Sequence, residues 1–212
     1  MFAGGDRPPT AVAAHLPGAA FVIAADSGLA AAAELGRRVD LVVGDLDSVD
    51  VDALAEARAA GSEVDAHPRE KDQTDLELAL DAALARGFRR ITVVGGHGGR
   101  LDHFAANLTL LAAPRYTGAA IDAWVGDAAV VVVRDEADLE GRPGELLSLV
   151  PLGGPARGIR TEGLRYPLDD EDLEPGTSRG VSNEFAAPRA RVTVRTGTLL
   201  AIRPDALADA PR

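Results

Sequence analysis

The sequence predicts a chain of two parts: an α/β domain with a parallel, Rossmann-like sheet, followed by an all-β domain, either a sandwich or a small barrel. Up to about residue 126, continuous apolar strands alternate with segments of helical period. Beyond that point, short strands are separated by glycine and proline, and no helical period interrupts them. We therefore place one domain at residues 1–126 and the second at residues 127–212.

In the first part, an apolar run that ends near a polar or glycine-rich turn marks each strand. Helices are expected from about residue 28 to 36, 52 to 60, 75 to 86 and 101 to 112, the third of them ending before Gly87. Only three residues precede the Gly4-Gly5-Asp6 turn, so a strand is expected to be truncated or missing there. The predicted strands are 21–25, 39–43, 63–66, 90–94 and 121–125.

In the second part, five strands are expected. The last two are separated by Thr196-Gly197, which favours a hairpin turn between them. The predicted strands are 128–133, 145–150, 158–164, 191–195 and 198–202.

Composition excludes several functional classes. The 212 residues contain no cysteine and only four histidines, so any metal is expected to be held by oxygen ligands rather than by thiolates. A net charge of −11 opposes binding to nucleic-acid phosphates and suits a cationic substrate or divalent ions. No apolar run is long enough for a membrane span and no secretory signal is evident, so a cytoplasmic location is expected.

Acidic residues follow successive predicted strands of the first part. Asp26 ends one strand, and Asp45 and Asp47 end the next. Asp72 and Asp75, three apart at the start of the third helix, are expected to share one face of it. Ligands of open α/β sheets bind outside the carboxyl ends of the strands, so these carboxylates are expected to converge on one crevice. Crowded carboxylates need a compensating cation, and a Mg²⁺ site is the simplest explanation.

Two further segments could contact phosphate. Lys71, the only lysine of the chain, lies among acids at the start of a helix, where Thr74 and Glu77 are spaced as a capping box. The glycine loop from Gly95 to Gly99 opens another helix, where backbone N–H groups can hold a phosphate, although a tight turn explains it nearly as well. The glycine loop matches neither of the common nucleotide-binding motifs.

Five short motifs in this order resemble the thiamine pyrophosphokinase family, and the resemblance covers nearly the whole chain. It implies a homodimer with active sites between subunits, and Mg²⁺-dependent transfer of a pyrophosphoryl group from ATP to the thiamine hydroxyl, with release of AMP. The motifs are Asp26-Ser27-Gly28, Gly44-Asp45-Leu46-Asp47-Ser48, Glu70-Lys71-Asp72-Gln73-Thr74-Asp75, Gly98-Gly99-Arg100-Leu101-Asp102-His103 and Ser182-Asn183-Glu184-Phe185.

Combined with the resemblance, the residues receive expected roles. The metal ligands are Asp45, Asp47 and Asp72, and Asp75 is the candidate to orient or deprotonate the hydroxyl. Lys71 and Arg100 are expected to contact phosphate oxygens, with Asp72 completing the catalytic set. The expected substrate and nucleotide contacts are Asp26, Gln73, Thr74, Gly96, Gly98, Gly99, Asp102, His103, Ser182 and Asn183.

For several of these residues, an interpretation without a functional role remains open. Arg100 and His103 could be exposed helix residues, and Ser182-Asn183 alone is an ordinary β-turn; only the resemblance places it against the thiamine pyrimidine of the partner subunit. Two other functions also remain open. The chain could be a diphosphokinase for another alcohol, such as a pterin, or a non-catalytic nucleotide-binding module with a regulatory role.

Overall fold

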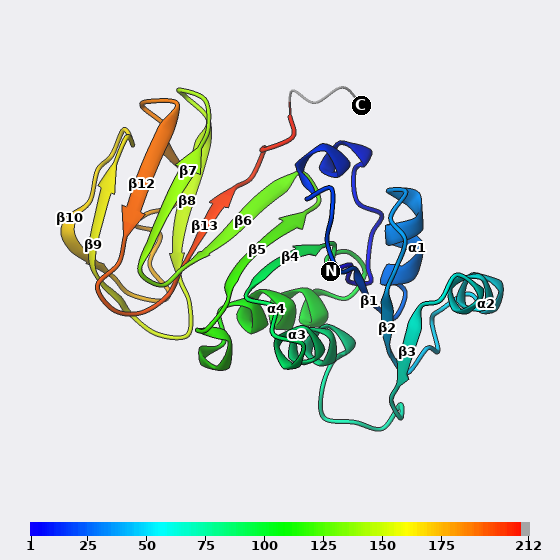
Figure 1. The fold of residues 1–212 in the computed structure, drawn as a ribbon. Coiled ribbons are helices and arrows are strands. Elements are labelled where there is room, and N and C mark those ends of the chain that lie inside the picture. The colour runs from blue at the N-terminus through cyan, green and yellow to red at the C-terminus, as the bar shows by residue number, and fades with distance from the viewer. Residues whose placement is uncertain (209–212) are drawn as a thin grey trace. The chain divides into compact units, whose positions relative to one another are not determined.

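The computed structural model describes residues 1–208, which form two compact units. Unit 1 comprises residues 1–107 and 123–126, and unit 2 comprises residues 108–122 and 127–208. The chain is mixed α/β, because unit 1 has a parallel sheet and unit 2 is built on antiparallel pairing (Figure 1). None of the described helices has the length and apolar character needed to cross a membrane.

Unit 1 alternates strands and helices, as the sequence predicts. β1, β2 and β3 are adjacent and parallel, and Ala25 of β1 lies opposite Val43 of β2. The elements are η1 (Thr10–His15), β1 (Ile23–Ala25), α1 (Gly28–Glu34), β2 (Leu41–Gly44), α2 (Val51–Ala59), β3 (Glu63–Ala66), α3 (Asp75–Ala85), β4 (Arg90–Val94) and α4 (Leu101–Leu111), which ends in unit 2.

The first three residues occupy the position of a strand between β1 and β4. Phe2 forms parallel bridges to both Ala24 and Val94. Its N–H donates to the carbonyl of Ile23 at 2.8 Å, and the N–H of Val94 donates to the carbonyl of Met1 at 2.9 Å. The strand position is therefore shortened rather than missing, because residues 1–3 provide backbone partners for both neighbours.

The parallel strands β1 and β2 are buried on both faces, which explains their continuous apolar sequences, whereas the edge strand β3 is largely exposed. Every residue of β1 and β2 is buried. α3 packs on β1 and β2, α1 packs on β1, and the two helices lie on opposite sides of these strands (Figure 1). α3 buries Leu76, Ala79, Leu80 and Ala83, which recur at helical spacing, so its amphipathic pattern determines which face meets the sheet.

Unit 2 contains two sheets with one shared apolar core. One sheet has the strand order β10-β9-β12-β7, and the other contains β11-β8-β13-β6-β5. Leu149, Ile159 and Phe185, each 0–1% exposed, belong to the same apolar cluster. The elements are η2 (Pro114–Tyr116), β5 (Ala120–Val125), which ends in unit 1, β6 (Ala128–Val133), β7 (Glu136–Glu140), β8 (Leu146–Pro151), β9 (Ala156–Glu162), β10 (Asp169–Leu173), β11 (Asn183–Glu184), β12 (Arg189–Thr193) and β13 (Leu199–Arg203).

The predicted hairpin at Thr196-Gly197 is wrong. β12 pairs with β7 and β9, whereas β13 pairs with β6 and β8 in the other sheet. Thr196 and Arg157 form an isolated antiparallel bridge, so the connection joins the two sheets rather than folding back on itself. A glycine turn between two alternating segments fits both geometries, and only the partners of each strand distinguish them.

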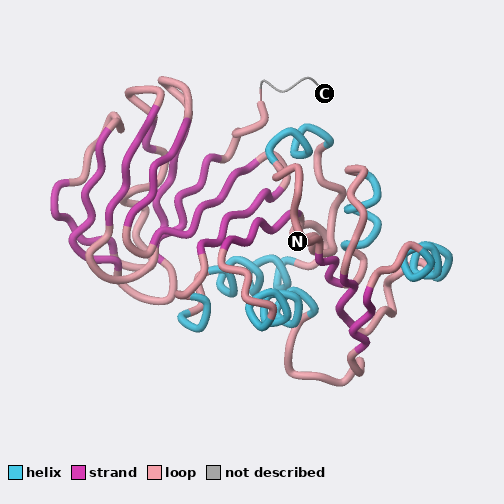
Figure 2. The backbone as a smooth tube through the Cα atoms, in the orientation of Figure 1, coloured by secondary structure: helices cyan, strands magenta, loops and turns pink. Residues whose placement is uncertain are grey.

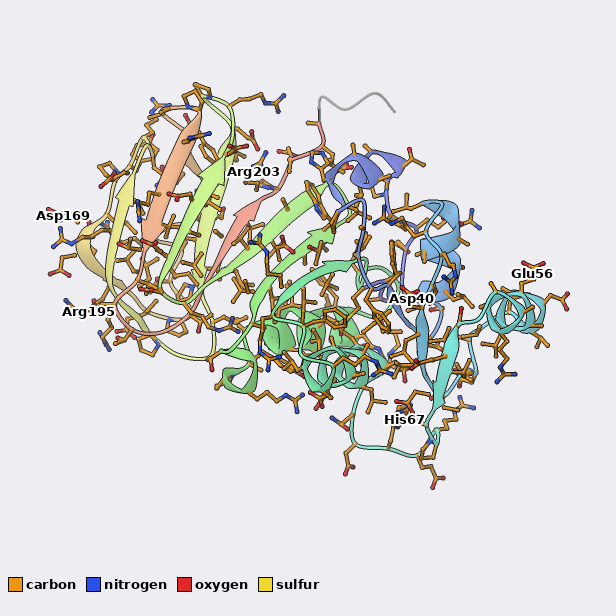
Figure 3. All side chains as sticks on the ribbon, viewed as in Figure 1. Asp40, Glu56, His67, Asp169, Arg195 and Arg203 are labelled. Atoms are coloured by element: carbon orange, nitrogen blue, oxygen red, sulfur yellow. The ribbon has the colours of Figure 1, made fainter. Side chains whose placement is uncertain are left out.

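Three strands of unit 2 were not predicted from the sequence, and all are at sheet edges. β7 and β10 consist largely of acidic residues, and β11 has only two residues. The smooth tube in Figure 2 shows β7 and β10 flanking the central strands of their sheet. Figure 3 shows Asp169 and Arg195 extending from this sheet into solvent, and arginines 157, 160, 189 and 191 on its central strands pair with acids of these edges. Charged residues on edge strands also discourage pairing with other chains.

Candidate functional site

Three aspartates meet at the carboxyl ends of β1 and β2. Asp26 directly follows β1, and Asp45 and Asp47 follow β2. One carboxylate oxygen from each of the three lies within 4.8 Å of those of the other two. Because the two strands are parallel and adjacent, their ends lie at the same edge of the sheet, as the sequence predicts.

Asp26 is the most buried member of this aspartate cluster. It is 8% exposed, its backbone is left-handed with φ of 48°, and its Oδ1 atom is buried without a hydrogen-bond partner among the described residues. Burial raises the pKa of Asp26, and the nearby charges of Asp75, Asp45 and Asp47 raise it further. A buried carboxylate oxygen without a donor is the environment that a bound cation would satisfy, so the cluster fits an oxygen-coordinated divalent ion.

Lys71 partly compensates the charge of the cluster. Its Nζ atom lies 2.9 Å from Oδ2 of Asp45 and 3.1 Å from Oδ1 of Asp75, and its side chain is 13% exposed. Burial opposes the lysine charge, but hydrogen bonds to Asp45 and Asp75 outweigh it and raise the pKa of Lys71. The hydrogen bonds from Lys71 and from the Asp47 N–H lower the pKa of Asp45, which therefore stays ionised.

Gly44 allows these acids to approach one another. It ends β2 with φ of 145°, and a Cβ atom there would lie 3.0 Å from Oδ1 of Asp75 and 3.2 Å from Cβ of Asp26. A side chain at this position would separate β2 from the acids that follow β1 and start α3. The glycine before Asp45 is thus part of the site geometry.

Asp47 and Asp72 are exposed. Asp47 accepts a hydrogen bond from Ser48 Oγ at 3.0 Å and pairs with Nε of Arg69 at 3.3 Å. Asp72 was predicted as a metal ligand, but the structure does not bring it into the cluster of Asp26, Asp45 and Asp47. Its position in the loop before α3 explains the difference, since the helical spacing assumed for Asp72 and Asp75 begins only at Asp75.

The start of α3 holds Gln73 and Thr74 in capping contacts. Oγ1 of Thr74 accepts from the N–H of Glu77 at 3.3 Å, which confirms the predicted N-cap. Nε2 of Gln73 donates to Oε1 of Glu77 at 3.2 Å and to Oδ2 of Asp81 at 2.9 Å. Both side chains therefore orient the segment that carries Lys71 and Asp75.

The glycine loop follows β4. Gly96, Gly98 and Gly99 all have positive φ, the conformation that glycine adopts readily in a tight turn. The backbone of Gly96 is already engaged, because its N–H donates to the carbonyl of Gly4 at 3.1 Å and its carbonyl accepts from Nδ2 of Asn107 at 2.8 Å. Arg100 and Asp102 form an exposed ion pair, with Nη2 and Oδ2 at 2.5 Å, and this hydrogen bond lowers the pKa of Asp102 to about 2.

His103 is exposed on α4, so the structure leaves Arg100, Asp102 and His103 on the surface beside the loop.

Asp6 is a residue near this loop that the sequence reasoning did not select. Its N–H donates to the carbonyl of His97 at 2.8 Å, and a Cβ atom on Gly98 would lie only 2.1 Å from its carboxyl carbon. Asp6 thus follows the first strand as Asp26 follows β1. The signal in the sequence is the Gly4-Gly5-Asp6 turn, which sets an acid after a strand position.

Ser182 and Asn183 lie in unit 2 and differ sharply in their exposure to solvent. Asn183 is 4% exposed; its Oδ1 accepts from the N–H groups of Tyr166 and Glu184, and its Nδ2 donates to the carbonyl of Tyr166 at 2.7 Å. Ser182 is exposed and has φ of 59°, a strained conformation for serine. Asn183 therefore fixes the backbone around Tyr166, which is 56% exposed, while Ser182 is accessible to a ligand.

A substitution of Asp26 tests the strain in the aspartate cluster. We expect Asp26→Asn to raise the melting temperature of the metal-free protein by roughly 2–6 °C, because it removes a buried, unpaired charge. The pKa of Asp26 is raised above its ordinary value of 3.8 in the folded protein. Between these two pKa values the native state retains a proton that the unfolded chain has lost, so the stability of wild type falls as the pH rises from 3.8 to the pKa of the folded state. This pH dependence should weaken in the variant.

Thermal melts between about pH 4 and pH 7 measure both effects. Asp52→Asn, on the exposed first turn of α2, is the matched control. A melting temperature of Asp26→Asn below that of wild type throughout this range would show that the carboxylate is needed for folding.

Fold and site together define a class of protein: a mixed α/β chain whose parallel sheet ends in a carboxylate cluster suited to a divalent cation. The family model described as thiamin pyrophosphokinase, catalytic domain, matches residues 13–123. The model described as thiamin pyrophosphokinase, vitamin B1 binding domain, matches residues 132–199. The chain belongs to the thiamin pyrophosphokinase family.

Individual relatives agree with this assignment. Thiamine pyrophosphokinase of Bacillus subtilis is 30% identical over 166 residues, which cover 76% of each chain. The crystal structure of thiamine pyrophosphokinase from Bacillus subtilis has a TM-score of 0.82 at 28% identity and covers 95% of both chains. A thiamin pyrophosphokinase family protein from Enterococcus faecalis gives 0.78 at 26% identity, again over 95% of both chains. The similarity thus spans both units.

Proposed function

We propose that this chain transfers a diphosphoryl group from ATP to the hydroxyl group of thiamine, forming thiamine diphosphate and AMP. The observation that carries the proposal is the cluster of Asp26, Asp45 and Asp47, with its buried unpaired oxygen, in a chain of this family. In the reaction, the hydroxyl oxygen forms a bond to the β-phosphorus, the bond from that phosphorus to the oxygen retained by AMP breaks, and the hydroxyl proton leaves to a base.

Asp26, Asp45 and Asp47 would hold Mg²⁺, and the sequence adds Asp72 as a further candidate from the exposed loop. When bound, Mg²⁺ would neutralise charge on the triphosphate. Asp75 would accept a hydrogen bond from the thiamine hydroxyl and orient its oxygen for attack, because its carboxylate is held at the start of α3 by Lys71.

Phosphate contacts would come from the basic residues and the glycine loop. Arg100 is 69% exposed, so its guanidinium can leave Asp102 for a triphosphate without losing buried contacts. The N–H groups near Gly98 and Gly99 would complete the phosphate contacts, with Asp102 and His103 beside them. We propose that residues 1–126 supply this nucleotide and metal region.

Residues 127–212 would contribute the thiamine contacts, which the match of residues 132–199 to a vitamin B1 binding domain supports. Ser182 would contact the pyrimidine, and buried Asn183 would act by fixing the backbone around it. We also propose that the first part has a Rossmann-like fold and that the second part is a β-sandwich. A homodimer with active sites between subunits and a cytoplasmic location stay predictions.

The proposal is tested by incubating the purified chain with ATP, Mg²⁺ and thiamine, and measuring AMP and thiamine diphosphate by chromatography. We expect the two products in equal amounts, and no turnover when EDTA replaces Mg²⁺. AMP formation with a pterin alcohol but not with thiamine would assign a different acceptor. Binding of ATP without AMP formation with either acceptor would identify a non-catalytic nucleotide-binding protein.

A further inference from the structure

Lys71 occupies an unusual position for a lysine. It is 13% exposed, and its ammonium group lies between Oδ2 of Asp45 at 2.9 Å and Oδ1 of Asp75 at 3.1 Å. Lysine is ordinarily exposed and strongly hydrated, and a buried ammonium is retained only when it is paired. In this structure the charge of the single lysine is therefore engaged by carboxylates.

The carboxylate of Asp45, which pairs with Lys71, also belongs to the aspartate cluster. Oδ1 of Asp45 accepts from the N–H of Asp47 at 3.2 Å, while Oδ2 accepts from Lys71 at 2.9 Å. Asp45 also belongs to the group whose oxygens approach within 4.8 Å of one another, together with Asp26 and Asp47. A divalent cation bound through Asp45 would thus lie close to an ammonium group, and two positive charges at that separation repel.

We infer that Lys71 is an internal counter-cation, which holds Asp45 and Asp75 in place before any ligand enters and lowers the affinity of the aspartate cluster for a free divalent cation. The inference rests on the proposed function, because it takes Asp26, Asp45 and Asp47 as the cation site. The ammonium contacts two carboxylates, those of Asp45 and Asp75, and Asp45 is in turn clustered with Asp26 and Asp47, so Lys71 neutralises the acidic charge of the site only in part.

The counter-cation also explains how one lysine can serve a phosphate. A triphosphate carries several negative charges and competes with Asp45 and Asp75 for the ammonium. Once Lys71 turns to phosphate, Asp45 is free of its competing cation. Metal and nucleotide therefore enter together, each strengthening the binding of the other, and this coupling is reciprocal by linkage.

Arg69 provides a matched comparison. Its Nε atom lies 3.3 Å from Oδ2 of Asp47, but its side chain is 82% exposed. Solvent screens such a pair strongly, whereas the pair of Lys71 and Asp45 is largely shielded. Removing either cation changes the net charge by the same amount, so a purely long-range charge effect would be similar in the two variants.

The test measures Mn²⁺ binding to the full chain without nucleotide, by calorimetry or by the paramagnetic resonance signal of free Mn²⁺. We expect Lys71→Gln to bind Mn²⁺ about tenfold more tightly than wild type, and Arg69→Gln to differ by less than about twofold. An affinity of Lys71→Gln equal to or weaker than wild type would overturn the inference. So would an equal gain in both variants.

The same titration with a non-hydrolysable ATP analogue separates this inference from the proposed function. We expect wild type to bind Mn²⁺ more tightly with the analogue present, and this gain to shrink in Lys71→Gln. Wild type that binds Mn²⁺ neither alone nor with the analogue would contradict the proposed metal site itself. A different outcome would contradict only the role of Lys71: wild type binds Mn²⁺ when the analogue is present, but Lys71→Gln without the analogue binds Mn²⁺ no more tightly than wild type.

Thermal melts make the variant informative even if it folds poorly. Without metal, Lys71→Gln should melt below wild type, because Asp45 and Asp75 lose their shared partner. Added Mn²⁺ should raise its melting temperature more than that of wild type. If the variant is unfolded without metal, folding on addition of Mn²⁺ supports the inference, and failure to fold at any Mn²⁺ concentration overturns it.

Discussion

Asp45→Asn is expected to lower kcat/KM for thiamine diphosphate formation by about a thousandfold or more. Asp45 is the residue that joins the two charged groups of the site, since it belongs to the aspartate cluster and also accepts a hydrogen bond from Lys71 at 2.9 Å. The amide keeps the size of the side chain but removes its charge, so both the cation site and the hold on Lys71 are weakened. We expect the fold to be retained, because Asp45 lies in a loop after β2.

Steady-state kinetics with varied Mg²⁺ measure this effect, and Mn²⁺ binding in the presence of an ATP analogue gives a second reading. Asp52→Asn is the matched control, because Asp52 lies exposed on the first turn of α2 and should stay within about twofold of wild type. More than a tenth of wild-type kcat/KM in Asp45→Asn at ordinary Mg²⁺ would show that Asp45 is not needed for the reaction.

Gly28→Ala is expected to destabilise unit 1 by about 3 kcal/mol or more, a loss of roughly 6–12 °C in melting temperature. Gly28 starts α1, and a Cβ atom there would lie 2.2 Å from the carbonyl oxygen of Phe2 and 2.6 Å from its carbonyl carbon. Both atoms are backbone atoms of the short first strand, so no side chain can rotate to relieve the overlap. Either α1 or the segment from Met1 to Ala3 must move.

The single tryptophan, Trp124, belongs to unit 1, so its fluorescence can follow the unfolding of that unit. Gly18→Ala serves as the control, because nothing lies within 4 Å of a Cβ atom at that position and its stability should change by less than about 0.5 kcal/mol. A melting temperature of Gly28→Ala within about 2 °C of wild type would mean that α1 does not pack on the first strand as described.

Unit 1 was largely predictable because its local signals agree with its tertiary structure. β3 and β4 coincide with their predicted ranges, and α3 begins at Asp75 after the N-cap at Thr74. Unit 2 was less predictable, because β10 is almost entirely acidic and the alternation of β7 depends on only two apolar residues, Ala137 and Leu139. Their acids form ion pairs with arginines on the neighbouring strands β9 and β12, which are distant in sequence.

The candidate site shows the same division. The carboxyl ends of adjacent parallel strands share one edge of the sheet, so the sequence predicts that Asp26, Asp45 and Asp47 lie close together. The structure places their carboxylates within one cluster. The position of Asp72 could not be predicted, because it depends on where the loop ends and α3 begins. The burial of Asn183 could not be predicted either, since its partner Tyr166 is 17 residues away along the chain.

By itself, the sequence determined the alternation of strands and helices, the family motifs and the strand ends at which acids gather, because these depend on local periodicity and on the order of residues along the chain. Only the tertiary structure decided that three residues suffice for the first strand, that β12 and β13 belong to different sheets, and that Lys71 lies between Asp45 and Asp75. Such contacts join residues far apart in sequence, where burial and pairing, rather than local propensity, select the partner.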